Sequence, residues 1–176
     1  MSLVELVISM AIAATVASSV FGSFLLLARS SLIGAAYVDM DREARAGLEI
    51  FARDVRSADN VDTFTANGVR LHLPAFGTTP AQWVTYSYDP TAKSFYRNRG
   101  AAGERELLRG IEVFILKRYS IQQNALTGEP LEATNNLETK QIQVQLRAMR
   151  TGAARATATN NVISARYILR NKIVSN

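Results

Sequence analysis

Residues 1–28, MSLVELVISMAIAATVASSVFGSFLLLA, carry one charged side chain, Glu5, in an otherwise apolar and small-residue run that ends before Arg29. As a helix, the stretch 6–28 is long enough to cross a hydrocarbon core of roughly 30 Å at about 1.5 Å per residue. The sequence therefore predicts that the chain starts as a membrane anchor.

The position of Glu5 separates three interpretations of this run. A secretory signal has a basic segment and an apolar stretch of about 7–15 residues, whereas here no Lys or Arg precedes the run and the run is longer. An ordinary transmembrane anchor fits the length, although a carboxylate at mid-membrane costs a few kcal/mol. Because Glu5 lies near an end, where snorkelling lowers that cost, the plain anchor stays open.

The third interpretation is a family resemblance. Ser2-Leu3-Val4-Glu5-Leu6 and the aliphatic run after it resemble the start of a mature type IV pilin or pseudopilin, with glutamate at the fifth mature residue. The resemblance implies that a prepilin peptidase removes a short leader before Met1 and that the new amino group is N-methylated. It also implies that Glu5 meets the amino terminus of a neighbouring subunit in a filament. A carboxylate among apolar helices needs such an opposite charge or strong donors.

The same resemblance implies that the anchor leaves the inner membrane and packs in the core of a helical filament. The partners it implies are copies of this chain or other pilin subunits, an assembly ATPase and a platform membrane protein. Pilins often have a proline near position 22, where this chain has Gly22, which permits bending or close helix packing. The residues expected in the filament core are Leu3, Val4, Leu6, Val7, Ile8, Ile12, Val16, Val20, Phe21, Phe24 and Leu25.

The helical pattern continues beyond Arg29, and no proline occurs until Pro74. Charged residues, Asp54 among them, fill most of the helix surface outside one apolar stripe. We predict one helix of roughly 55 residues, with segment 1–28 apolar all round and segment 29–57 amphipathic. The stripe recurs at steps of three and four and consists of Ile33, Tyr37, Met40, Ala44, Leu48, Phe51 and Val55.

From Val61 the pattern changes to the alternation typical of strands. Asn67-Gly68 predicts a two-residue hairpin turn with both residues at positive φ, which would place Phe64 opposite Leu71. A second hairpin is predicted over 83–99, and further strands over 111–121, 141–149 and 162–170. The stretches 74–81, 122–137 and 151–161 are predicted to be irregular.

In segment 141–149, Ile142, Val144, Leu146 and Ala148 alternate with polar residues, as expected for a sheet with one wet face. We expect the apolar face of one antiparallel sheet to cover the helix stripe. The fold class is thus α+β, a long N-terminal helix of the type IV pilin kind packed on a β-rich head, 58–176.

Three downstream segments extend the resemblance. They are 53–58 (RDVRSA), 84–98 (VTYSYDPTAKSFYRN) and 107–112 (LLRGIE). Their order is similar to W-type minor pilins and J-type minor pseudopilins. Minor subunits of those groups are thought to sit at the filament tip and initiate assembly, whereas a main subunit repeats along the shaft. The sequence leaves both roles open.

The formal charge of +5 is unevenly distributed, since no acid follows Glu138. A basic surface attracts DNA, anionic polysaccharide or lipid headgroups, but it is equally a solvated face or a contact for acidic helices of adjacent subunits. The alternative function is therefore a membrane-tethered protein whose basic head captures DNA or acidic glycans. The basic residues after Glu138 are Lys140, Arg147, Arg150, Arg155, Arg166, Arg170 and Lys172.

Catalytic signals are weak. The chain has no cysteine and one histidine, His72, which excludes thiol chemistry and the usual zinc sites. His72 alternates with two leucines and is expected to face solvent, and Glu104 and Glu106 are expected in an exposed connection. We therefore expect no catalytic, metal or cofactor-binding residues, and we predict a structural subunit rather than an enzyme.

Overall fold

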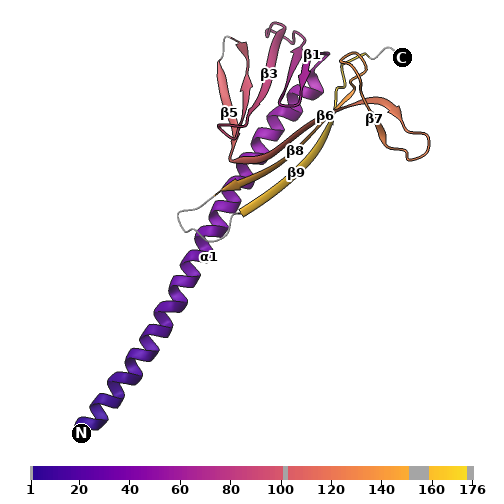
Figure 1. The fold of residues 1–176 in the computed structure, drawn as a ribbon. Coiled ribbons are helices and arrows are strands. Elements are labelled where there is room, and N and C mark those ends of the chain that lie inside the picture. Colours follow the sequence, from indigo (N-terminus) through magenta and orange to yellow (C-terminus); the bar gives the residue numbers. More distant parts are fainter. Residues whose placement is uncertain (1, 101–102, 151–158, 174–176) are drawn as a thin grey trace.

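One helix forms the stem of the molecule and carries two antiparallel sheets at its far end (Figure 1). The computed structural model describes residues 2–100, 103–150 and 159–173. Helix α1 spans Leu3–Ser57, 55 residues, which confirms the predicted single helix. The fold is α+β, with a long N-terminal helix packed on antiparallel sheets.

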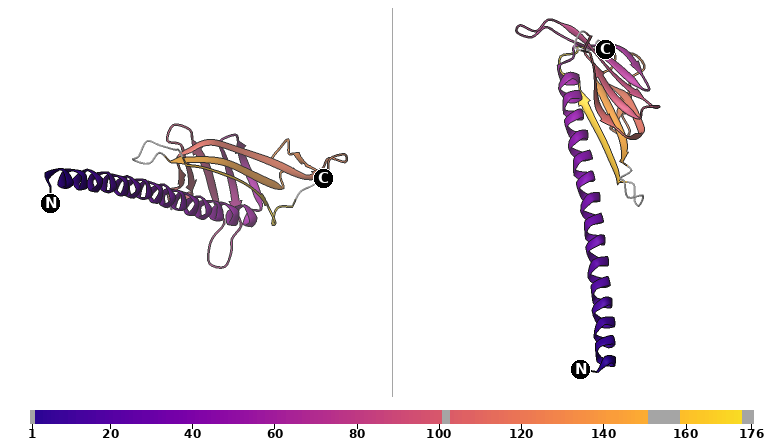
Figure 2. Two further views of the ribbon diagram at one scale, coloured as in Figure 1. Left: turned by 90° about the horizontal axis from the view of Figure 1, so that it is seen from below. Right: turned by 90° about the vertical axis from the view of Figure 1, so that its left-hand side faces the viewer.

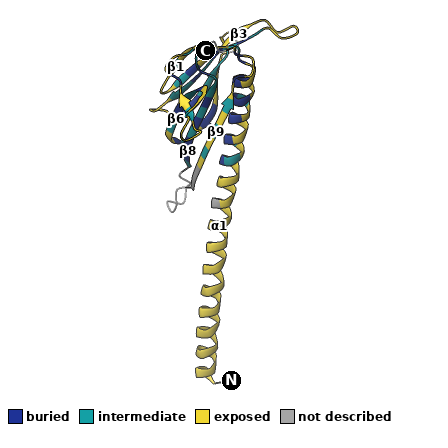
Figure 3. Cartoon of the chain, turned by 90° about the vertical axis from the view of Figure 1, so that its right-hand side faces the viewer, coloured by how far each residue is buried: buried dark blue, intermediate teal, exposed yellow. Residues whose placement is uncertain are grey.

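The head covers only the last third of α1 (Figures 2 and 3). Five residues of the predicted stripe are buried: Met40, Ala44, Leu48, Phe51 and Val55. The prediction was wrong for Tyr37, which is exposed because the sheets begin to cover the helix at Met40. The side chain of Ile33 lies outside the described part.

The first sheet is a five-stranded meander in sequence order. Its strands are β1 (Asn60–Thr65), β2 (Gly68–Leu73), β3 (Gln82–Asp89), β4 (Ser94–Asn98) and β5 (Glu104–Arg109). The second sheet has the order β7-β6-β8-β9. Its strands are β6 (Ile111–Gln123), β7 (Pro130–Glu132), β8 (Gln141–Arg150) and β9 (Thr159–Ile168).

The expectation of one sheet was therefore wrong, and Gly110 shows why. This residue alone separates β5 from β6, and it has the left-handed φ of 74° that glycine adopts at little cost. A Cβ atom there would lie 2.7 Å from the carbonyl oxygen of Met149. Gly110 thus lets the chain leave the first sheet and enter the second without a loop.

The first hairpin forms with a different register from the predicted one. Thr65 pairs with Gly68 and Phe64 with Val69, so the turn is Ala66-Asn67, and neither residue has a positive φ. Gly68 serves another purpose, because a Cβ on it would lie 2.6 Å from the carbonyl oxygen of Tyr86 on β3. The glycine allows close approach of two strands rather than a turn.

The other predicted strands are confirmed with small shifts at their ends. The β3–β4 turn is held by Asp89, whose Oδ1 accepts from the backbone N–H of Thr91 at 2.7 Å. On β8 the four alternating apolar residues are buried, each no more than 2% exposed. Segment 74–81 contains no named strand, as predicted, whereas 151–158 lies outside the described residues.

Strands β5 and β7 were missed in the sequence. β7 occupies part of the stretch predicted as irregular, and β5 occupies the predicted exposed connection. In β5 the alternation is broken because Phe95 pairs with Leu108 and Tyr96 with Glu106, which leaves Leu107 as a bulge. Both Leu107 and Leu108 are consequently buried, a pattern that period-two reasoning does not recognise.

Phe51 of α1 lies at the centre of the head core. Its ring makes edge contacts with Tyr86 at 4.8 Å, Tyr167 at 5.8 Å and Phe95 at 5.9 Å between centroids. These partners come from both sheets, so one helix residue ties the two sheets together. Each such aromatic pair adds about 0.5–1.5 kcal/mol beyond its buried area.

Candidate functional site

The candidate site is the part of α1 that the head leaves bare. Every side chain described between Ser2 and Asp39 is exposed. The eleven residues expected in a filament core are between 44% and 81% exposed, and they face all sides of the helix. Exposed apolar surface of this extent marks a membrane or protein contact.

This half of α1 meets the physical requirements of a membrane anchor. Within the described residues α1 is the one helix long and apolar enough to cross a membrane, with a mean hydropathy of 2.0 over its most apolar window and none of that window buried. The chain thus has a long apolar N-terminal helix suited to anchoring.

Between Leu6 and Ala28, the serine and threonine hydroxyl groups of this half-helix are all satisfied within the helix. Each donates to a backbone carbonyl oxygen three or four residues earlier, at 2.8–2.9 Å. An unpaired hydroxyl in an apolar environment costs roughly 2–7 kcal/mol, and these bonds remove that cost. The five donors between Leu6 and Ala28 are Ser9, Thr15, Ser18, Ser19 and Ser23.

Glu5 forms a capping box with Ser2 at the start of α1. The Ser2 N–H donates to Oε2 of Glu5 at 3.4 Å, and the Glu5 N–H donates to Oγ of Ser2 at 3.3 Å. Both distances are longer than the usual 2.9–3.0 Å. A carboxylate has about four lone-pair positions, so Glu5 keeps acceptor capacity for a further donor.

Two further predictions concern this segment. Met1, the expected methylation position, lies outside the described residues. At Gly22 the helix is continuous, and no atom lies within 4 Å of a Cβ built there. The intersubunit contact of Glu5 and the flexibility at Gly22 both stay predictions.

A buried polar cluster fixes the head on the end of α1. Oδ2 of Asp54 accepts from Nη2 of Arg97 at 2.6 Å, from Nε of Arg97 at 2.8 Å and from the Tyr86 hydroxyl at 2.7 Å. Burial, followed by the charge of Asp54, raises the pKa of Tyr86 far above its usual range. For Arg97, burial is the largest effect and opposes the charged form, but the hydrogen bond to Asp54 and the contributions of Tyr86 and the Asp54 charge together outweigh it and raise the pKa.

Asp54 is predicted from the sequence to lie on the solvent-exposed side of the helix, and this prediction was wrong. Its residue is 6% exposed, because it lies three positions after Phe51 and four before Ala58, on the buried stripe. That spacing from Phe51 and Ala58 was the feature of the sequence that could have predicted its burial. The cluster joins α1 to β3 and β4, so its role is to position the head.

Among the described basic residues after Glu138, the lysines are held by the head and the arginines are exposed. Lys172 is 4% exposed, and its Nζ donates to the carbonyl oxygen of Asn136. Nζ of Lys140 donates to the carbonyl oxygen of Lys172. Arg166 lies over the Tyr119 ring and donates to Gln143. Arg147 and Arg170 are exposed, whereas the side chain of Arg150 and all of Arg155 lie outside the described part.

His72 is more covered than predicted. It is on the outer face of the first sheet, but its Nδ1 lies 2.6 Å from Oδ1 of Asp59 and its ring lies 4.7 Å from that of Trp83. Glu104 is exposed, and Glu106 accepts from the Ser94 hydroxyl at 2.6 Å. In the described ranges, no three His, Asp or Glu side chains come together as a metal site.

The features that call for a functional explanation are therefore the bare apolar half of α1, the acid at its start and the rigid attachment of the head at its other end. Neither a scan against protein-family models nor a search of curated proteins finds a match to this chain.

Proposed function

We propose that this chain is a structural subunit of a type IV pilus-like or type II secretion pseudopilus filament. Residues 1–28 anchor it in the inner membrane before assembly and pack in the filament core afterwards, with the head in the periplasm or outside the cell. The observation that carries the proposal is the bare apolar half of α1, whose hydroxyl groups between Leu6 and Ala28 are already satisfied within the helix.

Moving such a helix from lipid into a bundle changes little for its apolar side chains, because lipid tails are as apolar as leucine. Glu5, at the start of the helix, is the residue for which lipid and a helix bundle differ most. Within the described part of a single chain, the Glu5 carboxylate accepts one long hydrogen bond, from the Ser2 N–H at 3.4 Å. In a bundle, the free amino group of another subunit supplies an opposite charge, and a buried carboxylate requires one.

The geometry also favours an open polymer. A stem on one copy that packs against the stem of the next, displaced along the axis, makes a head-to-tail contact that does not close into a ring, and such contacts generate filaments. The prepilin peptidase, the assembly ATPase and the platform protein are the partners that the resemblance implies. Labelling of filament ends against filament sides distinguishes a tip subunit from a shaft subunit.

The test compares Glu5→Ala with Glu49→Ala in cells that produce this chain. Glu49 is a matched control because it is an exposed acid on the same helix and pairs with Arg53 at 3.3 Å. We expect both variants in the membrane fraction, but Glu5→Ala absent from sheared surface filaments. Filaments that contain Glu5→Ala at the unaltered level would overturn the assembly role.

Mass spectrometry of the amino terminus gives an independent test. The proposal predicts protein that starts at Met1 and carries one added methyl group on its amino nitrogen. An unprocessed leader on protein from cells that also carry a prepilin peptidase would contradict it.

The alternative, a membrane-tethered protein that captures DNA or acidic glycans, has less support. It requires a basic surface, and two of its lysines, Lys140 and Lys172, bind backbone carbonyls of the head instead. This alternative predicts normal membrane anchoring after loss of Glu5 and salt-sensitive binding of polyanions by the head.

A further inference from the structure

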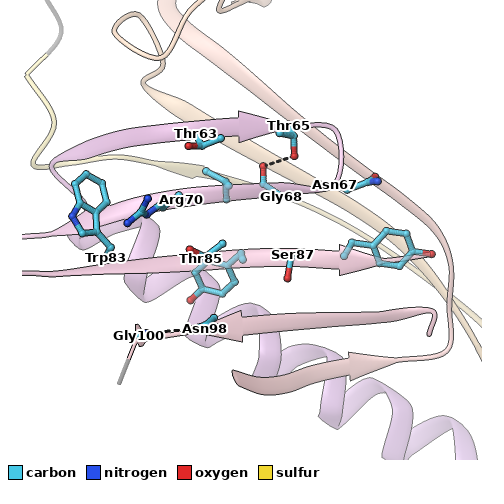
Figure 4. Close-up of a pocket in the computed structure, with 13 residues that line it drawn as sticks. Thr63, Thr65, Asn67, Gly68, Arg70, Trp83, Thr85, Ser87, Asn98 and Gly100 are labelled. Carbon is cyan, nitrogen blue, oxygen red and sulfur yellow. Dashed lines mark hydrogen bonds between the residues drawn. The ribbon is translucent and has the colours of Figure 1, made fainter. Parts of the chain in front are cut away.

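A groove of about 620 Å³ crosses the outer face of the first sheet (Figure 4). Strands β1 to β4 all contribute to it, and α1 lies behind them. The opposite face of these strands carries the buried residues Val69, Leu71, Val84 and Tyr86. The groove is therefore separate from the half-helix, although Tyr86, whose hydroxyl bonds to Asp54, is among the residues that line it.

Trp83, the single tryptophan of the chain, forms one end of the groove. The Arg70 guanidinium lies 4.9 Å from its ring centroid and the His72 ring lies 4.7 Å away. Asp62 holds Arg70 at 3.4 Å and Asp59 holds His72 at 2.6 Å. The indole is thus fixed in orientation while 37% of the residue stays exposed.

Uncharged polar side chains follow Trp83 along the groove. Figure 4 shows Thr85 and Ser87 beyond it on the same strand, Asn67 toward the other end and Asn98 beside them. Within the described part of the chain, the side chains of Asn67, Thr85 and Ser87 have no hydrogen-bond partner. From Trp83 to Ser87 the strand runs about 13 Å at its usual rise.

The charges of the groove argue against a polyanion. Among the described residues that line the groove, Arg70 is the one that is charged. Its guanidinium already pairs with Asp62 and lies over the Trp83 ring. Binding of a phosphate backbone rests on several Lys or Arg contacts. A rigid aromatic with a row of hydroxyl and amide groups is instead the chemistry that a neutral, hydroxyl-rich ligand requires.

We propose that this groove binds a short neutral oligosaccharide. The apolar face of one sugar ring stacks on the exposed indole of Trp83, and the hydroxyl groups of the following rings bond to Thr85, Ser87 and Asn67. Because the groove faces away from α1, a filament with α1 at its centre presents it outward. Only this last point rests on the proposed function.

The single tryptophan makes the test direct, because its fluorescence reports on the groove alone. The full chain, purified in a zwitterionic detergent without a sugar headgroup, is titrated with chitotetraose, maltotetraose and cellotetraose, and with a single-stranded DNA oligonucleotide. We expect a saturable change in emission with at least one tetrasaccharide and none with the DNA. No change with any of the three sugars, or saturation by DNA alone, overturns the proposal.

The double variant Thr85→Val/Ser87→Ala keeps the reporter and removes two of the proposed donors. We expect it to weaken the binding on the order of tenfold, since two hydrogen bonds to the sugar are lost. Thr91→Val, in the exposed β3–β4 turn, is the matched control and should bind as the unaltered chain does. Equal affinity of the double variant and the control contradicts the assigned groove.

Trp83→Ala, measured by calorimetry with the same sugar, should abolish binding, whereas Phe76→Ala removes an aromatic that is 86% exposed outside the groove and should not. If Trp83→Ala fails to fold, the double variant decides. Glu5→Ala should bind the sugar normally, so a failure of the filament role and a failure of the groove are distinguishable.

Discussion

Arg97 on β4 and Asp54 in the last turn of α1 form an ion pair of 2.6 Å between Nη2 and Oδ2, with side chains that are 14% and 8% exposed. The head is attached to the last third of α1, where the helix stripe from Met40 to Val55 is buried. This pair and the Tyr86 hydroxyl attached to it provide the buried polar part of that attachment, beside exposed bonds from Arg109 to Glu43 and from Asn171 to the Ser57 carbonyl oxygen. The attachment should therefore be sensitive to single substitutions.

Breaking the ion pair should destabilise the head strongly. Arg97→Met leaves Asp54 buried with only the Tyr86 hydroxyl as a partner, and loss of one member of a buried pair costs about 3–5 kcal/mol. Urea unfolding of the full chain in detergent measures the change. Arg53→Gln, which removes the exposed pair with Glu49, should cost less than about 1 kcal/mol. Equal effects of the two variants would show that the Asp54 pair is not structural.

Replacing both partners should restore much of this loss. In Asp54→Leu/Arg97→Met no charge remains at this site, and exchange of a buried ion pair for apolar residues is often neutral. The double variant should thus be more stable than Arg97→Met alone in the same urea experiment. Additive losses would instead indicate that packing around Phe51, rather than charge, sets the cost.

Gly47 should not tolerate alanine although it is in a helix. A Cβ there would lie 2.5 Å from Cδ1 of Leu108 and 3.0 Å from the carbonyl oxygen of Leu107. Overpacking costs about 1–3 kcal/mol, which exceeds the gain of up to ~1 kcal/mol from helix propensity. Gly47→Ala should lower the unfolding midpoint, whereas Gly34→Ala, with no atom within 4 Å of the new Cβ, should not.

A charge in the middle of the bare half-helix should prevent anchoring. Val16→Arg places a cation near the centre of the predicted span, which costs about 2.5–3.5 kcal/mol on insertion scales. Alkaline extraction of membranes should release this variant into the soluble fraction. Val38→Arg is the control because Val38 is also exposed, at 47%, but follows Arg29 and lies outside the span. Retention of both variants in the membrane would contradict the anchor.

The buried Lys172 should make the head more stable at mildly alkaline pH. Burial, then the charges of Lys140 and Arg118, lowers its pKa in the folded chain below the ordinary value of 10.5. Between the two pKa values the unfolded chain binds more protons than the folded one, so the free energy of unfolding rises with pH. Thermal unfolding between about pH 8 and pH 10 should show this rise in the unaltered chain and not in Lys172→Met.

Lys117→Met is the control for that experiment. Lys117 is exposed on β6, and its hydrogen bond to Glu132 raises its pKa, the opposite direction. Its loss should leave the alkaline rise in place. A rise that persists in Lys172→Met would assign the effect to another group.

The patterns that repeat over many residues were readable in the sequence. The helix and its two halves were predicted from the apolar run before Arg29 and from the stripe between Met40 and Val55. This prediction succeeded because the helical period repeats over about fifteen turns, so many residues support it. The alternation in 141–149 gave β8 and its buried face in the same way. The features missed depend on single residues: the bulge at Leu107, the corner at Gly110 and the close approach at Gly68.

By itself, the sequence determined an apolar stem with one acid near its start, because residues 1–28 have no polar face that could be turned to water. Only the tertiary structure decided which polar residues are internal. Asp54, Arg97, Lys140 and Lys172 look like surface charges in the sequence, yet each binds a partner at least 32 residues away. Trp83 and the hydroxyl row of β3 likewise became one groove only when β2 paired with β3, since strand pairing sets which side chains share a face.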